Sequence, residues 1–346
     1  MMKIARLGFA LLASVLFLLV CACSTEAVIQ EVLGKSLEAP VFIDCRPVSS
    51  TEIAFTFSRP VRVVSLNFDI DIETDSIEEG EEVIITLSRP LEAGRKITAD
   101  ILVEDSGRNS LNVIVPFRSR NDRMPAIIFN EIRTEYTKSK PEYVEFFVLG
   151  SGNLGAMKFF IAGYSQNPVY EFPPAEVSAG EYIVLHLRTM DEECKDETGQ
   201  DLALSGGNDA QSNARDLWVP GAVKLIHKTD ALWLADQDGK IIDAVLLCEK
   251  PDAGWGKSTA IPAAAEMLGR ENAWLPPAGA VSGEDGNLPA SWIPGPDDAV
   301  FSGTTTNTRT ICRDETIPPG PRAKNWYVTV TSGATPGKAN NVKRYN

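Results

Sequence analysis

The chain has 346 residues, of which 44% are hydrophobic and 23% are charged. Its length predicts about two domains, and its composition is that of a globular protein and not of a disordered chain. Because 47 acidic residues outnumber 33 basic ones, the net charge is −14, which argues against a surface built mainly to neutralise nucleic-acid phosphates. The chain has only two histidines, too few for a histidine-rich metal centre. We therefore expect no nucleic-acid partner, no cofactor and no metal site.

The N-terminus has the features of an export signal. Lys3 and Arg6 precede an uncharged run over residues 7–20, whose length suits the apolar core of a signal peptide and is short for a membrane span. The run ends in VCACS at residues 20–24, which resembles a bacterial lipobox. Cys23 fits best as the lipidated residue, because Ala22 supplies the small side chain before it. An ordinary secretory signal with two incidental cysteines is the alternative, and it also predicts export.

The lipobox resemblance implies a signal peptide over residues 1–22 and a lipid-anchored linker over residues 23–37. A lipidated cysteine would hold the protein on a bacterial membrane without a membrane-spanning helix. The expected location is the cell envelope, with the outer membrane or the cell surface as open possibilities.

Export changes the meaning of the four remaining cysteines, which are Cys45, Cys194, Cys248 and Cys312. An exported protein is in a compartment that permits disulfides, and four cysteines allow three pairings. The sequence does not choose among these pairings, and free buried thiols are the alternative. If one pair exists, the candidate disulfide is Cys248 with Cys312, because each ends a strand-like run in the same predicted domain.

Residues 38–120 show the alternation of apolar and polar side chains that is typical of β-strands with one solvated face. Turn sequences at 79–80, 93–94 and 105–107 separate the alternating runs, and short strands at this spacing predict a β-sandwich. The stretches FSRP at 57–60 and LSRP at 87–90 are each expected to end a strand, since proline cannot continue a ladder. The block resembles the bacterial Ig-like modules of envelope and surface-layer proteins.

The second block covers about residues 125–341 and contains five short motifs in order. They are NEI at 130–132, P-x-YVE at 141–145, AGEYIVL at 179–185, DG-x-I-I-D-x-V at 238–245 and TPG-x-x-N at 335–340. Together they resemble a lamin tail domain, an Ig-like β-sandwich that is also found in exported bacterial proteins. The expected fold class is therefore all-β, with two Ig-like β-sandwich domains in tandem after a lipoprotein signal peptide.

The resemblance implies an interaction or scaffold module, with no residue that transfers as catalytic. Tyr143, Val144 and Phe146 are expected as strand residues, and Gly239 and Gly337 as turn residues. Glu145 is the exception, because it is a carboxylate on a strand, and a paired structural role is the expected one.

Two insertions make the second block long for that family. The first, near residues 189–222, is rich in acidic and small residues, and we interpret it as a solvated loop, with a calcium-binding loop as the alternative. The second, near residues 250–303, carries Trp255, Trp274 and Trp292 among glycine, proline and alanine. These tryptophans are candidate ligand-binding residues, since indoles on loops stack on sugars or anchor a protein partner. Packing over the sandwich is the structural alternative.

Motifs of known enzymes match poorly. Residues 256–258 read GKS but lack the first glycine of a phosphate-binding loop, and their β-rich surroundings do not suit a nucleophile elbow. Strand alternation places His186 on a solvated face. We therefore predict a protein that is not an enzyme: a lipid-anchored envelope or surface protein that binds an envelope or external protein as a scaffold or interaction module. One alternative is a carbohydrate- or peptidoglycan-binding module that uses the three tryptophans, and a second is an exported hydrolase or nuclease.

Overall fold

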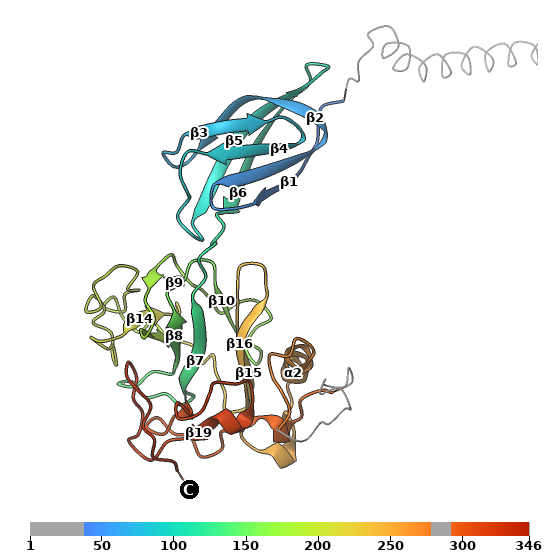
Figure 1. Cartoon of the computed structure of the whole chain (residues 1–346). Coiled ribbons are helices and arrows are strands. Elements are labelled where there is room, and N and C mark those ends of the chain that lie inside the picture. The colour runs from blue at the N-terminus through green and yellow to red at the C-terminus, as the bar shows by residue number, and fades with distance from the viewer. Residues whose placement is uncertain (1–37, 278–291, 346) are drawn as a thin grey trace, which may run out of the picture. The chain divides into compact units, whose positions relative to one another are not determined.

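The computed structural model describes residues 38–277 and 292–345 (Figure 1). The predicted signal peptide, Cys23 and the linker lie outside the described residues. Within the described part, no helix is both long enough and apolar enough to span a bilayer. The described residues divide into two compact units, which are 38–90 with Lys96–Arg118, and Leu91–Arg95 with 119–277 and 292–345. We call them unit 1 and unit 2.

Unit 1 is a six-stranded antiparallel sheet in which β2 is the central element. Its strands are β1 (Phe42–Pro47), β2 (Glu52–Phe68), β3 (Thr74–Glu78), β4 (Gly80–Leu87), β5 (Lys96–Asp105) and β6 (Ser110–Arg118). The order is β3-β4-β2-β5-β6, and β1 also pairs with β2. Alternate apolar residues of β2, β4 and β5 are buried and form the core of the unit, including Phe55, Ile85 and Ile101.

The prediction that FSRP at 57–60 ends a strand is wrong. β2 continues through Pro60 with a shift of register between Thr56 and Val61. Before the shift β2 pairs with β1 and β4, and after it β2 pairs with β5. Proline is tolerated there because the ladder is interrupted, so its missing N–H breaks no regular pairing. At the second stretch β4 does end, at Leu87.

Unit 2 contains two larger sheets that enclose one apolar core. The six-stranded sheet has the order β14-β13-β8-β7-β18-β19 and the five-stranded sheet the order β11-β10-β15-β16-β17. The strands of the six-stranded sheet are β7 (Ala126–Arg133), β8 (Tyr143–Gly150), β13 (Tyr182–His186), β14 (Arg215–Trp218), β18 (Ile311–Arg313) and β19 (Trp326–Val328). Those of the five-stranded sheet are β10 (Lys158–Ile161), β11 (Tyr170–Glu171), β15 (Asp230–Ala235), β16 (Ile241–Cys248) and β17 (Val300–Phe301).

The centre of the unit 2 core is a cluster of phenylalanines from separate elements. Phe146 lies 5.0 Å from Phe129, 6.0 Å from Phe159 and 5.7 Å from Phe172, measured between ring centroids. All four rings are fully buried. Such tilted and edge-to-face pairs stabilise the core beyond the area that they bury.

Short elements complete unit 2. A two-stranded sheet joins β9 (Gly152–Asn153) and β12 (Glu176–Val177). The helix α2 (Ala260–Arg270) lies in the second insertion and contacts β15, and its buried side chains include Ile261 and Leu268. Short 3₁₀ turns form at Pro251–Ala253, Pro296–Asp298 and Ala323–Asn325. The predicted all-β fold class is confirmed, with α2 as the one α-helix in the described part of the chain.

Candidate functional site

The three tryptophans of the second insertion do not form an exposed platform. Trp274 is fully buried in the unit 2 core, and its indole Nε1 donates to the carbonyl oxygen of Asp298 at 2.9 Å. Its prediction as a ligand-binding residue is therefore wrong, because the insertion folds down with α2 onto the core. Trp255 and Trp292 are half-buried against the same core. These two side chains therefore pack on the core, as the structural alternative expected, and their role in ligand binding stays a prediction.

The candidate disulfide is also not formed. Cys248 and Cys312 are both buried free thiols, as Cys45 and Cys194 are free thiols at half-buried positions. Cys248 ends β16 in the five-stranded sheet, whereas Cys312 is the central residue of β18 in the six-stranded sheet. The prediction rested on both residues ending strand-like runs of one domain, but the two strands belong to different sheets.

Several buried polar residues of unit 2 lie together on one face of the six-stranded sheet. In β7 a register shift between Phe129 and Glu131 reverses the alternation, so that Phe129 and Ile132 face the core while Glu131 and Arg133 face the opposite side. Across the sheet, Glu131 pairs with Glu145 on β8 and with Cys312 on β18. The next row of the same face consists of Arg133, Tyr143, His186 and Trp218. We call this surface the polar face.

Glu131 and Glu145 hold the C-terminal motif onto the polar face. Glu131 accepts hydrogen bonds from the backbone N–H of Thr335, at 3.1 Å to each carboxylate oxygen, and from the Thr310 hydroxyl. Glu145 Oε2 accepts from the backbone N–H of Gly337 at 2.5 Å. Gly337 has φ of +77°, and a β-carbon on it would lie 3.0 Å from the Ala214 β-carbon, so glycine is required there.

Asn130 connects the first and last motifs of the second block. Its side-chain amide donates to Glu145 Oε1 at 2.8 Å, and its Oδ1 accepts from Asn340 Nδ2 at 3.0 Å. The NEI, P-x-YVE and TPG-x-x-N motifs are therefore three parts of one buried hydrogen-bond network. The pairing expected for Glu145 exists, and its partners are the opening and closing motifs.

The polar face is electrostatically unusual because two carboxyl groups are buried side by side. Burial, followed by the negative charge of Glu131, raises the pKa of Glu145 well above its usual range. Burial also raises the pKa of Glu131, although hydrogen bonds from Thr310 and Thr335 oppose that change. Burial and then the charge of Glu131 likewise raise the pKa values of Tyr143 and Cys312. These directions favour a neutral Glu145 beside Glu131.

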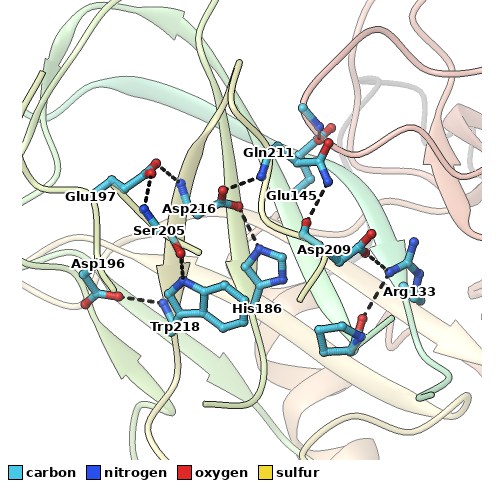
Figure 2. Close-up of polar contacts among 12 residues, drawn as sticks. Arg133, Glu145, His186, Asp196, Glu197, Ser205, Asp209, Gln211, Asp216 and Trp218 are labelled. Carbon is cyan, nitrogen blue, oxygen red and sulfur yellow. Dashed lines mark hydrogen bonds and ion pairs between the residues drawn. The ribbon is translucent and has the colours of Figure 1, made fainter. Parts of the chain in front are cut away.

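The prediction that His186 lies on a solvated face is wrong. The residue is fully buried, its Nε2 lies 2.7 Å from Asp216 Oδ1, and its ring stacks on Trp218 with 3.9 Å between centroids (Figure 2). Asp216 also accepts from the backbone N–H of Gln211 at 2.6 Å. The side chains of β13 alternate as predicted, but the first insertion covers the second face of the strand, so both of its faces are buried.

Arg133 extends the polar face towards the first insertion. Its guanidinium forms an ion pair with Asp209 (Figure 2). It also donates to the carbonyl oxygen of Pro141 at 3.2 Å. The guanidinium also lies 4.5 Å from the centroid of the Tyr143 ring. Asp209 comes from the first insertion, so this pair attaches the insertion to the sheet.

The first insertion is solvated only in part: Asp191, Glu192, Glu193 and Asp201 are exposed as expected, but Asp196 and Glu197 cap the edge of the six-stranded sheet. Glu197 Oε2 accepts from the backbone N–H of Asp216 at 2.8 Å, and Asp196 Oδ1 accepts from that of Trp218 at 2.7 Å (Figure 2). These two N–H groups belong to β14, the edge strand. Burial raises the pKa of both capping carboxyl groups. The carboxylates take the place that carbonyl oxygens of another strand would occupy.

A second buried ion pair gives the second aspartate of the DG-x-I-I-D-x-V motif, Asp243, its structural role. Arg313 Nη2 lies 2.5 Å from Asp243 Oδ2, and Arg313 Nε donates to the carbonyl oxygen of Phe129 at 2.6 Å. Asp243 also accepts from the backbone N–H of Phe129 at 2.8 Å. The pair therefore joins β16 of one sheet to β7 and β18 of the other. Burial raises the pKa of Asp243, and the neighbouring guanidinium opposes that shift.

The chemistry that these groups can perform is limited by their burial. A histidine bonded to a carboxylate is the base half of a catalytic triad, but the His186 ring is enclosed by Asp216 and Trp218. Within residues 38–277 and 292–345, no three His, Cys, Asp or Glu side chains are grouped as metal ligands. Sequence reasoning missed the polar face because its one local signal, carboxylates at 131 and 145 within apolar strands, does not reveal what covers them.

Comparison with known proteins places unit 2 in a family. A family model described as TP_1001_2nd, protein second domain, matches residues 125–328, which is more than half of the chain. The chain belongs to this family. Over 196 residues it is 29% identical to an uncharacterized protein of Treponema pallidum (strain Nichols), and the match covers 53% of this chain and 48% of that protein. The chain thus spans about half the length of the relative that it matches.

Two solved structures show weaker similarity. The N-terminal part of the bacterial S-layer protein SbsC is 17% identical with a TM-score of 0.24, and the match covers 38% of this chain and 37% of that one. A DUF4876 family protein from Bacteroides thetaiotaomicron is 11% identical with a TM-score of 0.27, and the match covers 85% of this chain and 93% of that one. At these TM-scores neither similarity indicates a shared function.

Proposed function

We propose that the chain is an exported, lipid-anchored protein of the bacterial cell envelope or surface that acts by binding another protein, as an interaction or scaffold module. The observation that carries the proposal is the use of the motif side chains in unit 2. Glu131, Glu145 and Asp243 all accept backbone N–H groups from distant segments. The motif side chains are thus used to hold the fold together. This is what we expect of a protein that functions through its exposed surface and not through a catalytic centre.

Support for export and anchoring comes from the N-terminal sequence. The basic residues, the uncharged run and the lipobox-like VCACS together suit a lipoprotein. The lamin-tail resemblance of the second block supports an interaction role. Unit 2 also presents large apolar side chains to solvent, on which a protein partner would gain contact area; they are Leu149, Tyr164, Leu204, Val223, Ile293, Phe301, Ile317, Val342 and Tyr345.

Site-specific cross-linking in living cells tests the proposal. A photoreactive amino acid is placed at Leu149, Val223 or Val342 in three separate variants, each of which samples a different exposed part of unit 2. We expect a discrete adduct of constant mass from at least one position, because a scaffold has a defined partner. The matched control places the same amino acid at the buried Leu185, which should form no intermolecular adduct. If none of the exposed positions gives an adduct, the binding role is wrong for these parts of the surface.

A further inference from the structure

The segment over residues 333–341 covers one row of the polar face, and we call this segment the strap. The row consists of cross-strand neighbours on β8, β7, β18 and β19, which are Glu145, Glu131, Cys312 and Tyr327. The first three are fully buried and Tyr327 is 9% exposed. The Tyr327 hydroxyl donates to the carbonyl oxygen of Asn341 at 2.8 Å, so the strap reaches the far end of the row.

The strap is held on the polar face by hydrogen bonds. Three of its backbone N–H groups donate to carboxyl groups, which are those of Glu131, Glu145 and Glu315. The buried residues of the strap are two glycines and an asparagine. Among the described residues that form the apolar core of unit 2, none comes from the strap. The state of the carboxyl groups beneath the strap therefore decides how firmly it is held.

The two ends of the strap are fixed close to each other. The backbone N–H of Tyr345 donates to the carbonyl oxygen of Val328 at 2.8 Å, and that of Val330 donates to Lys343 at 3.2 Å. The chain enters the strap through the exposed Ser332, whose φ of +59° is uncommon for a residue other than glycine. The strap is thus a loop that can lift from the polar face while its base stays paired.

Protonation and closure of the strap are linked. With the strap closed, burial raises the pKa values of Glu131 and Glu145, and the charge of Glu131 raises that of Glu145 further. With the strap lifted, water reaches both carboxyl groups, and their pKa values return towards the ordinary value of about 4.3. Opening therefore releases protons, so the open fraction rises with pH, by at most about tenfold per pH unit for each proton released.

The other titratable groups that face the pair do not reverse this direction. They are Tyr143 on β8, Tyr182 on β13, Cys312 on β18 and Glu315 after β18. Burial raises the pKa values of the two tyrosines and the thiol, so these groups stay neutral while carboxyl groups titrate. The charge of Glu315 adds to the repulsion at Glu145. The cation of the strap, Lys338, is exposed, and Arg133, which lies over the Tyr143 ring, is paired with Asp209.

We propose that the strap is a pH-operated cover, which lies closed over the polar face at acidic pH and lifts as the pH rises, when the Glu131 and Glu145 pair loses its last proton. Lifting exposes this carboxylate pair and the Cys312 thiol to solvent. The device is independent of the proposed protein interaction and of lipid anchoring, since it needs only contacts within unit 2.

The reactivity of Cys312 measures the opening, because this thiol lies in the covered row between Glu131 and Tyr327. The full-length protein is pulsed with N-ethylmaleimide, and mass spectrometry of its peptides gives the labelling rate of each native cysteine. The rate is divided by that of the same protein unfolded in urea at the same pH, which removes the intrinsic pH dependence of the thiol. We expect this ratio for Cys312 to rise about tenfold or more between about pH 5.5 and pH 8.5.

Controls separate the strap from the rest of unit 2. Cys248 is buried in the five-stranded sheet, so its ratio reports opening of the whole unit and should not follow that of Cys312. Glu131→Gln should flatten the pH dependence at Cys312, whereas Glu192→Gln, at an exposed position, should retain it. Gly337→Ala strains the strap at a φ of +77° and should raise the Cys312 ratio about tenfold at acidic pH.

Three results would overturn the proposal. A Cys312 ratio that does not change with pH would show that the strap does not respond to protons. An equal rise at Cys312 and Cys248 would assign the opening to the whole unit. A rise of wild-type size in Glu131→Gln would show that the carboxyl pair does not control the strap. If thermal unfolding shows that Glu131→Gln is not folded, the comparison of Cys312 with Cys248 in the unaltered chain decides the question.

Discussion

Glu131 and Glu145 lie opposite each other on neighbouring antiparallel strands, and both are fully buried. Like charges in this position repel each other, and burial disfavours both charged forms. Each carboxyl is nevertheless well bonded, because backbone N–H groups of the C-terminal motif and hydroxyl or amide groups surround it. At the residue scale, the order of short motifs in the sequence is thus explained by one network, in which Glu145 and Gly337 meet although they lie 192 positions apart.

Replacing Glu131 by glutamine should reduce the dependence of stability on pH. A carboxyl whose pKa is raised on folding contributes stability that is full below about pH 4.3, the ordinary glutamate value, and is lost as the pH rises towards the folded-state pKa. Because the amide side chain in Glu131→Gln carries no charge, the pKa of Glu145 should fall in that variant. The loss of unfolding free energy between about pH 5 and pH 8 should then shrink by about 1 kcal/mol or more.

Urea denaturation at the two pH values measures this loss. The amide of glutamine still offers an oxygen to Thr335 N–H and donates to the Thr310 hydroxyl, so the fold should be kept. Glu192→Gln is the control, since Glu192 is exposed in the same unit and should leave the pH dependence unaltered. An equal pH dependence in Glu131→Gln and the wild type would show that the two carboxyl groups do not interact.

At the scale of elements, each insertion covers part of a sheet that would otherwise be open. The first insertion caps the N–H groups of β14 with Asp196 and Glu197. The second brings α2 and Trp274 onto the unit 2 core. The first insertion looked like a solvent-exposed addition in the sequence, because acidic and small residues are typical of loops. For the second, exposed tryptophans and packing over the sandwich were both open, and Trp274 follows the packing alternative. Their structural role depends on the strand edge or apolar surface that they meet.

Glu197→Ala should open the edge of β14. The substitution leaves the N–H groups of Asp216 and Ser205 without their acceptors, and each buried unpaired donor costs about 1–3 kcal/mol. We expect lower stability and, because an uncapped edge pairs with other chains, concentration-dependent self-association in light scattering. Glu192→Ala, an exposed acidic residue of the same insertion, should remain monodisperse to the same degree as the wild type. Wild-type behaviour of Glu197→Ala would contradict a capping role.

Trp274→Ala should destabilise the protein far more than Trp255→Ala. Removal of the fully buried Trp274 indole leaves a large cavity and an unpaired Asp298 carbonyl, so we expect a loss of about 3–5 kcal/mol in unfolding free energy. Trp255 is only half-buried against the core and serves as the paired control. Chemical denaturation of both variants measures the difference. Similar losses would mean that α2 and its flanking segments do not cover the core as described.

The whole molecule combines two β-rich units with a strongly acidic composition. Each unit has an apolar core of its own. The family match over residues 125–328 lies within unit 2. The proposed attachment to a membrane rests entirely on residues 1–37, and it is therefore tested on the full-length protein in cells.

Cys23→Ala should release the protein from membranes. Removal of the lipidated cysteine takes away the acyl chains, and no other uncharged run of the sequence is long enough to span a bilayer. Fractionation of cells should find the wild type with the membranes and Cys23→Ala in the soluble fraction or as uncleaved precursor. Cys21→Ala is the control and should stay with the membranes. Protease treatment of intact and lysed cells then separates surface display from a location inside the envelope. Membrane association of Cys23→Ala that has the mass of the cleaved protein would rule out lipidation at that residue.

The sequence by itself determined that the chain is β-rich and which residues occupy many of its strands, because alternation with period two is a local property of each strand. It also provided the prediction of export, which rests on one contiguous stretch. Only the tertiary structure decided that His186 is buried, that Cys248 and Cys312 lie in different sheets, and that Trp274 belongs to the core. The physical reason is that burial and pairing depend on which distant segment covers a sheet face. Glu131 meets Thr335, and β14 meets Asp196 and Glu197, only after the chain has folded back on itself.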